Sequence, residues 1–197
     1  MTKICVVGPE ESKWKPEQIP KAKKTITDIL MNHYTEYDNY GQFEPELEVI
    51  LVSGHCPKGG VDIWAEEVAD KLGIKNEIHA PEVNQWEDRI TDIPFNKNEV
   101  KEHHIDITGL RFDGYYYYQV YKQKGYRSRN IDMAKTCDVL YCIVPFDNSK
   151  YCIHHEWTEK DKEGNIIHYL PHPKNGGCWT LEYAKKLGKE VYLVVIE

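Results

Sequence analysis

The chain has 197 residues, of which 41% are hydrophobic and 29% are charged, the ordinary balance of a water-soluble protein. This length is enough for one substantial core and too short for two comfortable domains. The formal net charge of −7 argues against a general nucleic-acid binder, because such a protein needs a basic face.

The first half of the chain alternates short apolar runs with amphipathic stretches. We expect strands at residues 4–7, 48–52 and 76–79, and helices at residues 17–33 and 61–72. Gly73 occupies the position after the second helix where glycine commonly ends one.

The second half is less regular. Residues 81–124 are polar and carry a run of four tyrosines at 115–118, and we expect one helix there, at 112–122. Further along we expect helices at 127–135 and 178–187 and strands at 139–144 and 191–196. Strands alternating with helices imply a mostly parallel sheet covered on both faces. We therefore predict a single α/β domain over residues 1–197, with insertions at about 81–124 and 146–175.

The apolar runs are too short to span a bilayer; one of the longest covers only residues 191–196. The first residues lead directly into an expected strand, without the apolar core of a signal peptide. We therefore expect a cytoplasmic protein with no membrane contact. Its six cysteines are then reduced thiols or metal ligands rather than disulfides.

Three glycine-bearing patches lie at the ends of apolar runs or at the starts of expected helices. They are Gly8-Pro9, the segment from Ser53-Gly54 to Gly59-Gly60, and Gly176-Gly177 before Thr180. Glycine lets backbone N–H groups approach a ligand closely, and a helix N-terminus favours a phosphate. The patches therefore predict a nucleotide-type phosphate as the ligand, without naming a reaction.

Charged residues near these patches are further candidates. Asp62 either caps the start of its helix or contacts a ribose hydroxyl. Arg127 and the pair Arg129-Asn130 lie near the start of a helix, where a guanidinium suits a phosphate or a carboxylate. The alternative for the arginines is a surface salt bridge, and it stays fully open for Arg127. A tyrosine next to Arg127 is a candidate for the pocket wall, although most tyrosines here are expected in a core or a dimer contact.

These motifs resemble those of YspA-like proteins in the SLOG superfamily, which is named for Smf/DprA and the lonely-guy enzymes. The segments concerned are Ser53-Gly54-x4-Gly59-Gly60-Val61-Asp62 with Ala65-Glu66, Gly125-x3-Arg129-Asn130-x2-Met133, and Gly176-Gly177-Cys178-Trp179-Thr180. The resemblance extends over most of the chain, from Ile4 to Ile196. It implies a Rossmann-like three-layer sandwich with about five mostly parallel strands, and a nucleotide or nucleotide-derived ligand at their carboxyl ends.

Lonely-guy enzymes hydrolyse the N-glycosidic bond of modified adenosine monophosphates, and their motif reads PGGxGTxxE. In this sequence the residue three positions after Thr180 is Tyr183. Glu182 comes one residue earlier, about 100° around a helix. The leading hypothesis is therefore a soluble binding or sensor protein for a nucleotide or nucleotide-derived ligand.

Two alternatives remain open. A nucleoside 5′-monophosphate phosphoribohydrolase would hold the phosphate with Arg129 and activate water with Glu182 or Glu66. A single-stranded DNA-binding module, as in the Smf/DprA branch, is disfavoured by the acidic charge. We expect no organic cofactor beyond the nucleotide, and the sequence leaves a homo-oligomer open.

Cysteines and histidines gather in the second insertion and at the helix after it. Cys152, His155, His172 and Cys178 would form a Cys2His2 zinc site, with His154 or His168 able to replace either histidine. Four protein ligands would make this site structural. The alternative is that these residues simply cluster in a surface loop.

Overall fold

The structure is a computed structural model. It describes residues 1–34, 36–37, 43–44, 49–56, 58–81, 105–111, 114–123, 125–154, 158–160, 166–168 and 171–197, with side chains for 1–34, 49–56, 58–80, 125–154 and 171–197.

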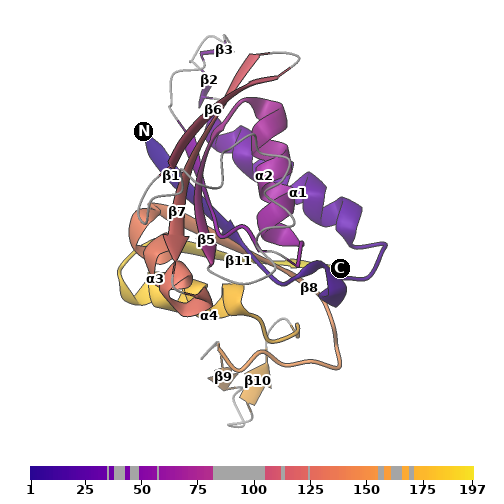
Figure 1. Cartoon of the computed structure of the whole chain (residues 1–197). Helices are drawn as coiled ribbons and strands as arrows, with labels where there is room; N and C mark the ends of the chain where they lie inside the picture. The colour runs from indigo at the N-terminus through magenta and orange to yellow at the C-terminus, as the bar shows by residue number, and fades with distance from the viewer. Residues whose placement is uncertain are drawn as a thin grey trace.

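A seven-stranded sheet forms the middle of the molecule (Figure 1). Its strands are β1 (Thr2–Val7), β4 (Val49–Ser53), β5 (Lys75–Pro81), β6 (Ile105–Arg111), β7 (Gly114–Gln123), β8 (Val139–Pro145) and β11 (Glu190–Ile196), in the spatial order β11-β8-β1-β4-β5-β7-β6. All neighbours pair in parallel except β6, which is antiparallel to β7. Two small antiparallel pairs lie outside this sheet, namely β2 (Glu36–Tyr37) with β3 (Phe43–Glu44) and β9 (Thr158–Lys160) with β10 (Ile166–His168).

Helices cover both faces of the sheet (Figure 1). They are α1 (Ile19–Tyr34), α2 (Val61–Leu72), α3 (Tyr126–Thr136) and α4 (Gly176–Lys186), and a short 3₁₀ helix η1 (Glu11–Lys13) follows β1. Because side chains alternate along a strand, Ile4 and Val6 of β1 face the core that includes α1 and α2. Cys5 and Val7 face the core that includes α3 and α4. The expected three-layer arrangement is therefore confirmed.

The order of the five core strands determines where a crevice opens at the edge of the sheet. Across the sheet it runs β5-β4-β1-β8-β11, which in sequence terms is the order 3-2-1-4-5 of a Rossmann-like fold. The connection after β1 leads to α1 on one face of the sheet, and the connection after β8 leads to α4 on the other, so a crevice opens outside the carboxyl ends of these two strands. Ligands of doubly wound sheets bind at this switch point.

The tyrosine-rich segment corrects the sequence analysis. We predicted a helix at 112–122, and the structure has the strand β7 there, parallel to β5 and paired with β6. Tyrosine and valine favour strands, and the segment shows no helical period of apolar residues. The parallel five-stranded core expected from the sequence is present, and β7 and β6 extend it at the β5 edge.

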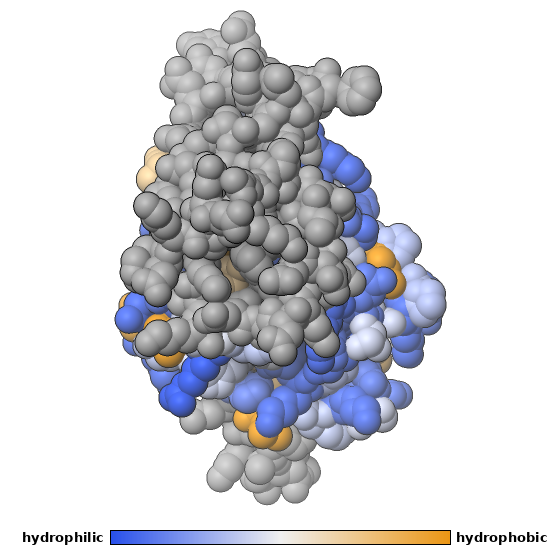
Figure 2. All heavy atoms as spheres, in the orientation of Figure 1, coloured by the Kyte–Doolittle hydropathy of each residue, from blue (hydrophilic) through white to orange (hydrophobic). Residues whose placement is uncertain are grey.

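Among the described helices, none combines the length and the apolar character needed to cross a bilayer. On the face drawn in Figure 2, the described surface is mostly hydrophilic, and its hydrophobic residues form small, separate patches.

Candidate functional site

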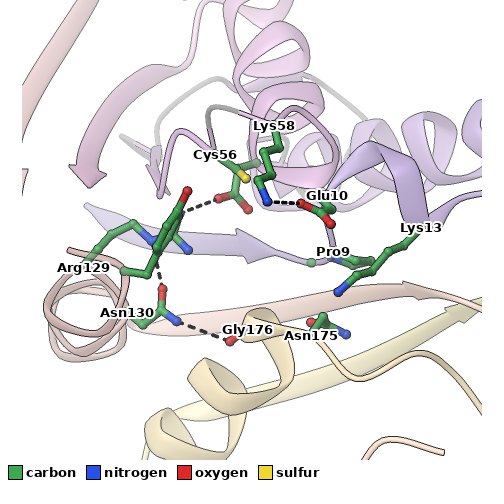
Figure 3. Close-up of a pocket in the computed structure, with 12 residues that line it drawn as sticks. Pro9, Glu10, Lys13, Cys56, Lys58, Arg129, Asn130, Asn175 and Gly176 are labelled. Atoms are coloured by element: carbon green, nitrogen blue, oxygen red, sulfur yellow. Dashed lines mark hydrogen bonds and ion pairs between the residues drawn. The ribbon is translucent and has the colours of Figure 1, made fainter. Parts of the chain in front are cut away.

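Four segments that are distant in the sequence meet around one cavity of about 320 Å³ (Figure 3). They are the turn after β1, the loop between β4 and α2, the start of α3 and the start of α4. The lining residues are Gly8, Pro9, Glu10, Lys13, Cys56, Lys58, Asp62, Tyr126, Arg129, Asn130, Asn175 and Gly176. The cavity lies at the carboxyl end of β1, at the switch point of the sheet, and its volume falls within the roughly 300–1,000 Å³ usual for small-molecule sites.

Arg129 is the buried cation of this cavity. Its Nε donates to Asn130 Oδ1 at 2.9 Å, and its Nη1 donates to the Gly54 carbonyl oxygen at 3.0 Å. The same Nη1 lies 3.3 Å from Asp62 Oδ2. The guanidinium also lies over the Tyr126 ring, with 5.2 Å between its carbon and the ring centroid. Arg129 therefore joins α3 to the loop between β4 and α2.

Asp62, in the first turn of α2, is buried, and the N-cap of this helix is Gly60 rather than Asp62. Burial away from water raises the pKa of Asp62 to about 6, although the Arg129 guanidinium opposes this rise; the nearby Glu66 carboxylate adds to it. A carboxyl group that titrates near neutral pH inside a cavity is typical of functional sites.

Behind Asp62 lies a second buried polar group. Ser53 Oγ donates to Glu66 Oε1 at 2.5 Å, and His55 Nδ1 lies 2.7 Å from Glu66 Oε2. The backbone N–H of His55 also donates to Ser53 Oγ, at 3.2 Å. His55 has a φ of 45°, in the left-handed region that non-glycine residues rarely adopt. This network holds the loop after β4, but its side chains lie outside the cavity lining.

The start of α4 forms another wall. Asn175 is the N-cap of this helix, because its Oδ1 accepts a hydrogen bond from the Cys178 N–H at 3.0 Å. Asn130 Nδ2 donates to the Gly176 carbonyl oxygen at 3.4 Å. Thr180 Oγ1 donates to the same oxygen at 2.9 Å, so its hydroxyl serves the helix backbone. The cavity thus faces the positive end of a helix of 11 residues.

Two glycines allow the turn after β1 to pass directly against α4. A Cβ on Gly177 would lie 2.9 Å from the Cα of Gly8, and a Cβ on Gly8 would lie 2.3 Å from the Ile143 carbonyl oxygen. The structure therefore requires these glycines for backbone packing, whereas we expected them to allow the close approach of a ligand.

Two lysines add positive charge to the cavity. Lys58 Nζ lies 3.4 Å from Glu10 Oε2 (Figure 3). Lys13 Nζ donates to the Lys174 carbonyl oxygen at 3.1 Å. Together with Arg129, they outnumber the carboxylates of Glu10 and Asp62 in the lining. The protein is acidic overall, but this cavity carries a local positive excess.

The predicted ligand-binding residues fall into three groups. Those that line the cavity are Gly8, Pro9, Asp62, Arg129, Asn130 and Gly176. Those that belong to the same turns without lining it are Ser53, Gly54, Gly59, Gly60, Gly177 and Thr180. Arg127 is exposed and Glu182 is half-buried, and both lie outside the lining.

Sequence reasoning missed several lining residues: Glu10, Lys13, Cys56, Lys58 and Asn175. Asn175 carried a usable signal, because asparagine directly before a helix is a preferred N-cap. Lys13 and Lys58 carried no such sequence signal, since their position in the cavity depends on contacts between distant segments.

A cluster of candidate metal ligands lies behind the wall that α4 forms. The ligand atoms of Cys152, His172 and Cys178 all lie within 4.8 Å of one another, so this group could hold a metal ion. His172 Nε2 is 3.4 Å from Cys178 Sγ, and both residues are buried. The hydrogen bond with the neighbouring Cys142 thiol raises the pKa of Cys178.

The other histidines named for this site are not part of the cluster. His155 and the side chain of His168 lie outside the described residues. His154 is half-buried and does not belong to the group of three.

The chain has a Rossmann-like α/β fold with a cavity at the switch point of its sheet. No protein-family model matches the chain, and no curated protein matches it. Two solved structures are similar over 98% of this chain. The molybdenum cofactor carrier protein MCP from Chlamydomonas reinhardtii has a TM-score of 0.49 and 16% identity, with 75% of its chain covered. DNA processing protein A (DprA) from Streptococcus pneumoniae has a TM-score of 0.48 and 15% identity, and this chain spans 50% of its length.

Proposed function

We propose that the protein binds a nucleotide or nucleotide-derived ligand and acts as a binding or sensor protein. The observation that carries this proposal is the convergence of Arg129, the N-terminal turn of α4 at Gly176 and the turn after β1 at Gly8 on one cavity. The Arg129 guanidinium and the N-terminus of α4 each favour an anion, and the turn after β1 closes the phosphate cradle beside them.

The arrangement also offers a place for the rest of a nucleotide. Tyr126 lines the cavity and is 40% exposed, and in this proposal its ring stacks on the base. Arg129 lies over the Tyr126 ring, so its guanidinium would contact both the phosphate and this ring. Lys13 and Lys58 would neutralise further phosphate charge.

We further propose that the chain is a member of the SLOG superfamily. The support is the placement of the three motifs, since each of them contributes a residue to the cavity: Asp62, Arg129 and Gly176. The cytoplasmic location expected from the sequence belongs to the same proposal. None of the six cysteines forms a disulfide, as is usual in a reducing compartment.

One observation favours hydrolysis as a second candidate function. Asp62 lines the cavity beside Arg129, and its pKa of about 6 suits general acid–base catalysis near neutral pH. Glu182 and Glu66, the carboxylates named from the sequence, lie outside the lining. In a phosphoribohydrolase, Asp62 would therefore take the role first given to them.

The experiment is a thermal-shift screen of nucleotides, cyclic nucleotides and ADP-ribose, followed by calorimetric titration of the best compound. A ligand that binds only the folded protein raises the melting temperature by mass action. Arg129→Met is expected to abolish the shift, and Arg127→Met is the matched control because Arg127 is exposed and outside the cavity. Equal binding by both variants would refute the proposal.

Two further assays separate the alternatives. Chromatography after incubation with adenosine, guanosine and cytidine monophosphates detects free base, and its release above the buffer rate would support hydrolysis. A salt-sensitive gel shift with a single-stranded oligonucleotide would support the DNA-binding alternative. The solved structure of DprA, a DNA-processing protein, is one reason to include this assay.

For the cluster of Cys152, His172 and Cys178 we propose zinc as the metal. Thiolate and imidazole are the ligands that zinc prefers in structural sites. Elemental analysis of protein purified without a His tag tests this proposal. About one equivalent of zinc is expected, and less than about a tenth of an equivalent would dismiss the site.

A further inference from the structure

The strand β11 forms an edge of the seven-stranded sheet. Within the described part of the chain, it pairs with β8 on one side, and no strand pairs with its other side. The backbone of Ile196 faces β8, because its carbonyl oxygen accepts a hydrogen bond from the Phe146 N–H at 2.8 Å. Since backbone groups alternate in direction along a strand, Val191, Leu193 and Val195 point their N–H and C=O groups away from the sheet.

This edge lacks the features that usually prevent a strand from pairing with another chain. Residues 191–196 contain no charged residue and no proline, and none of residues 191–195 is buried. Tyr192 is 44% exposed and stacks on Tyr141 of β8, with 5.0 Å between the ring centroids. A long, apolar and uncovered edge of this kind is a template for a further strand.

The sequence of β11 is complementary to itself in the antiparallel direction. With Leu193 on a two-fold axis, Val191 lies opposite Val195. Tyr192 then lies opposite Val194, and an aromatic side chain beside a β-branched one is a favourable cross-strand pair. The residues with outward-pointing backbone groups face one another in this register, so each such pair exchanges two hydrogen bonds.

The charges that flank β11 favour this register over its neighbours. With the axis at Leu193, Lys189 lies opposite Glu197 at both ends of the strand pair, so opposite charges meet twice. Moving the axis by one residue in either direction places one of these two charges opposite a valine. This charge complementarity points to a second copy of the chain as the partner of the edge.

We propose that β11 pairs with the β11 of a second copy of this chain, antiparallel about a two-fold axis at Leu193. The pairing continues the sheet from one subunit into the other and covers both exposed edges at once. No residue of β11 lines the cavity, so this inference does not depend on the proposed ligand. One strand a side is less than the roughly 20–30 residues a side of a standard interface, so we expect a dissociation constant in the micromolar range.

Disulfide trapping tests this geometry in the full chain. A hydrogen-bonded antiparallel pair has its Cα atoms about 5.5 Å apart, within the range of a disulfide. Leu193→Cys places two new cysteines opposite each other on the axis, so mild oxidation should give a covalent dimer of twice the 23.1 kDa chain mass on a non-reducing gel. Tyr192→Cys is the matched control, because its two copies are offset along the strands by about 7–8 Å, beyond disulfide reach.

Charge reversal gives a second test that leaves β11 unchanged. Lys189→Glu and Glu197→Lys each set like charges opposite one another in two places, so each should weaken dimerisation about tenfold in sedimentation equilibrium. The double variant restores opposite charges and should recover the wild-type dissociation constant. Lys71→Glu makes the same charge change at an exposed residue in the last turn of α2 and should have no effect.

A wild-type protein that sediments as a 23.1 kDa monomer at a concentration of several hundred micromolar would overturn the inference. Equal trapping of Leu193→Cys and Tyr192→Cys would also overturn it, because only the residue on the axis lies opposite itself. If Leu193→Cys does not fold, the charge-reversal series decides. A dimer that is unaffected by either single reversal pairs through another surface, and a loss that the double variant repairs supports the antiparallel pair.

Discussion

Replacing Asp62 by asparagine is expected to stabilise the protein at neutral pH. The pKa of Asp62 is about 6, against 3.8 for an unperturbed aspartate, and desolvation is the main cause. The attraction to Arg129 is already included in this value. The folded protein therefore holds the Asp62 proton more tightly than the unfolded chain does.

The size of the effect follows from the two pKa values. One pKa unit corresponds to about 1.4 kcal/mol, so ionisation of Asp62 lowers the free energy of unfolding by about 3 kcal/mol at pH 7. The stability that protonated Asp62 provides is fully present below pH 3.8 and is lost as the pH rises through about 6. Asparagine resembles the protonated acid and does not titrate.

Urea denaturation at a series of pH values measures this difference. The free energy of unfolding of Asp62→Asn should match that of the wild type near pH 4. It should exceed the wild-type value by about 3 kcal/mol above pH 7. Asp28→Asn is the control: Asp28 is exposed and its ion pair with Lys24 lies on the surface, so changes stay within about 0.5 kcal/mol.

A variant that is less stable than the wild type at pH 7, or a difference that does not change with pH, would refute this reasoning. The ion pair of Asp62 with Arg129 would then be a net stabiliser. If the prediction holds, the protein retains a destabilising charge inside its cavity, which is the pattern of a residue kept for function.

Four further predictions concern packing, the cavity and the metal. Gly177→Ala should lose about 1–3 kcal/mol in urea denaturation, because its Cβ would lie 2.9 Å from the Gly8 Cα. Gly176→Ala meets its nearest atom at 3.6 Å and should fold normally, while its methyl group weakens nucleotide binding in calorimetry; equal behaviour of the two variants would contradict the packing described here. Chelation should lower both the melting temperature and the nucleotide affinity, because the proposed metal centre and the cavity share one helix turn, and added zinc should restore both. Trp14→Ala should lose about 3–5 kcal/mol, because the buried Trp14 ring packs edge-to-face on Trp64 with 5.3 Å between centroids; a loss below about 1 kcal/mol would be inconsistent with that burial.

The parallel core was predictable because its signals are local. Apolar periodicity and glycine stops define α2, whose bounds of Val61–Leu72 agree with the helix expected at 61–72. The strand β7 was not predictable in this way. Its pairing partners, β5 and β6, decide its conformation, and the tyrosine run alone does not name them.

The candidate site also contains residues with a local sequence signal and residues without one. The motifs pointed to turns that meet around one cavity, because glycine and arginine are visible in the sequence. They did not distinguish a residue that lines the cavity from one that supports it. Thr180 is an example, since its hydroxyl bonds to the helix backbone. Lys13 and Lys58 enter the cavity only because separate segments converge, which no local pattern records.

A crystal structure of the protein soaked with adenosine monophosphate tests the central claim most directly. We predict the phosphate within hydrogen-bond distance of the Arg129 guanidinium and of the first N–H groups of α4. A nucleotide ordered elsewhere on the protein, with this cavity empty at saturating concentration, would contradict the account.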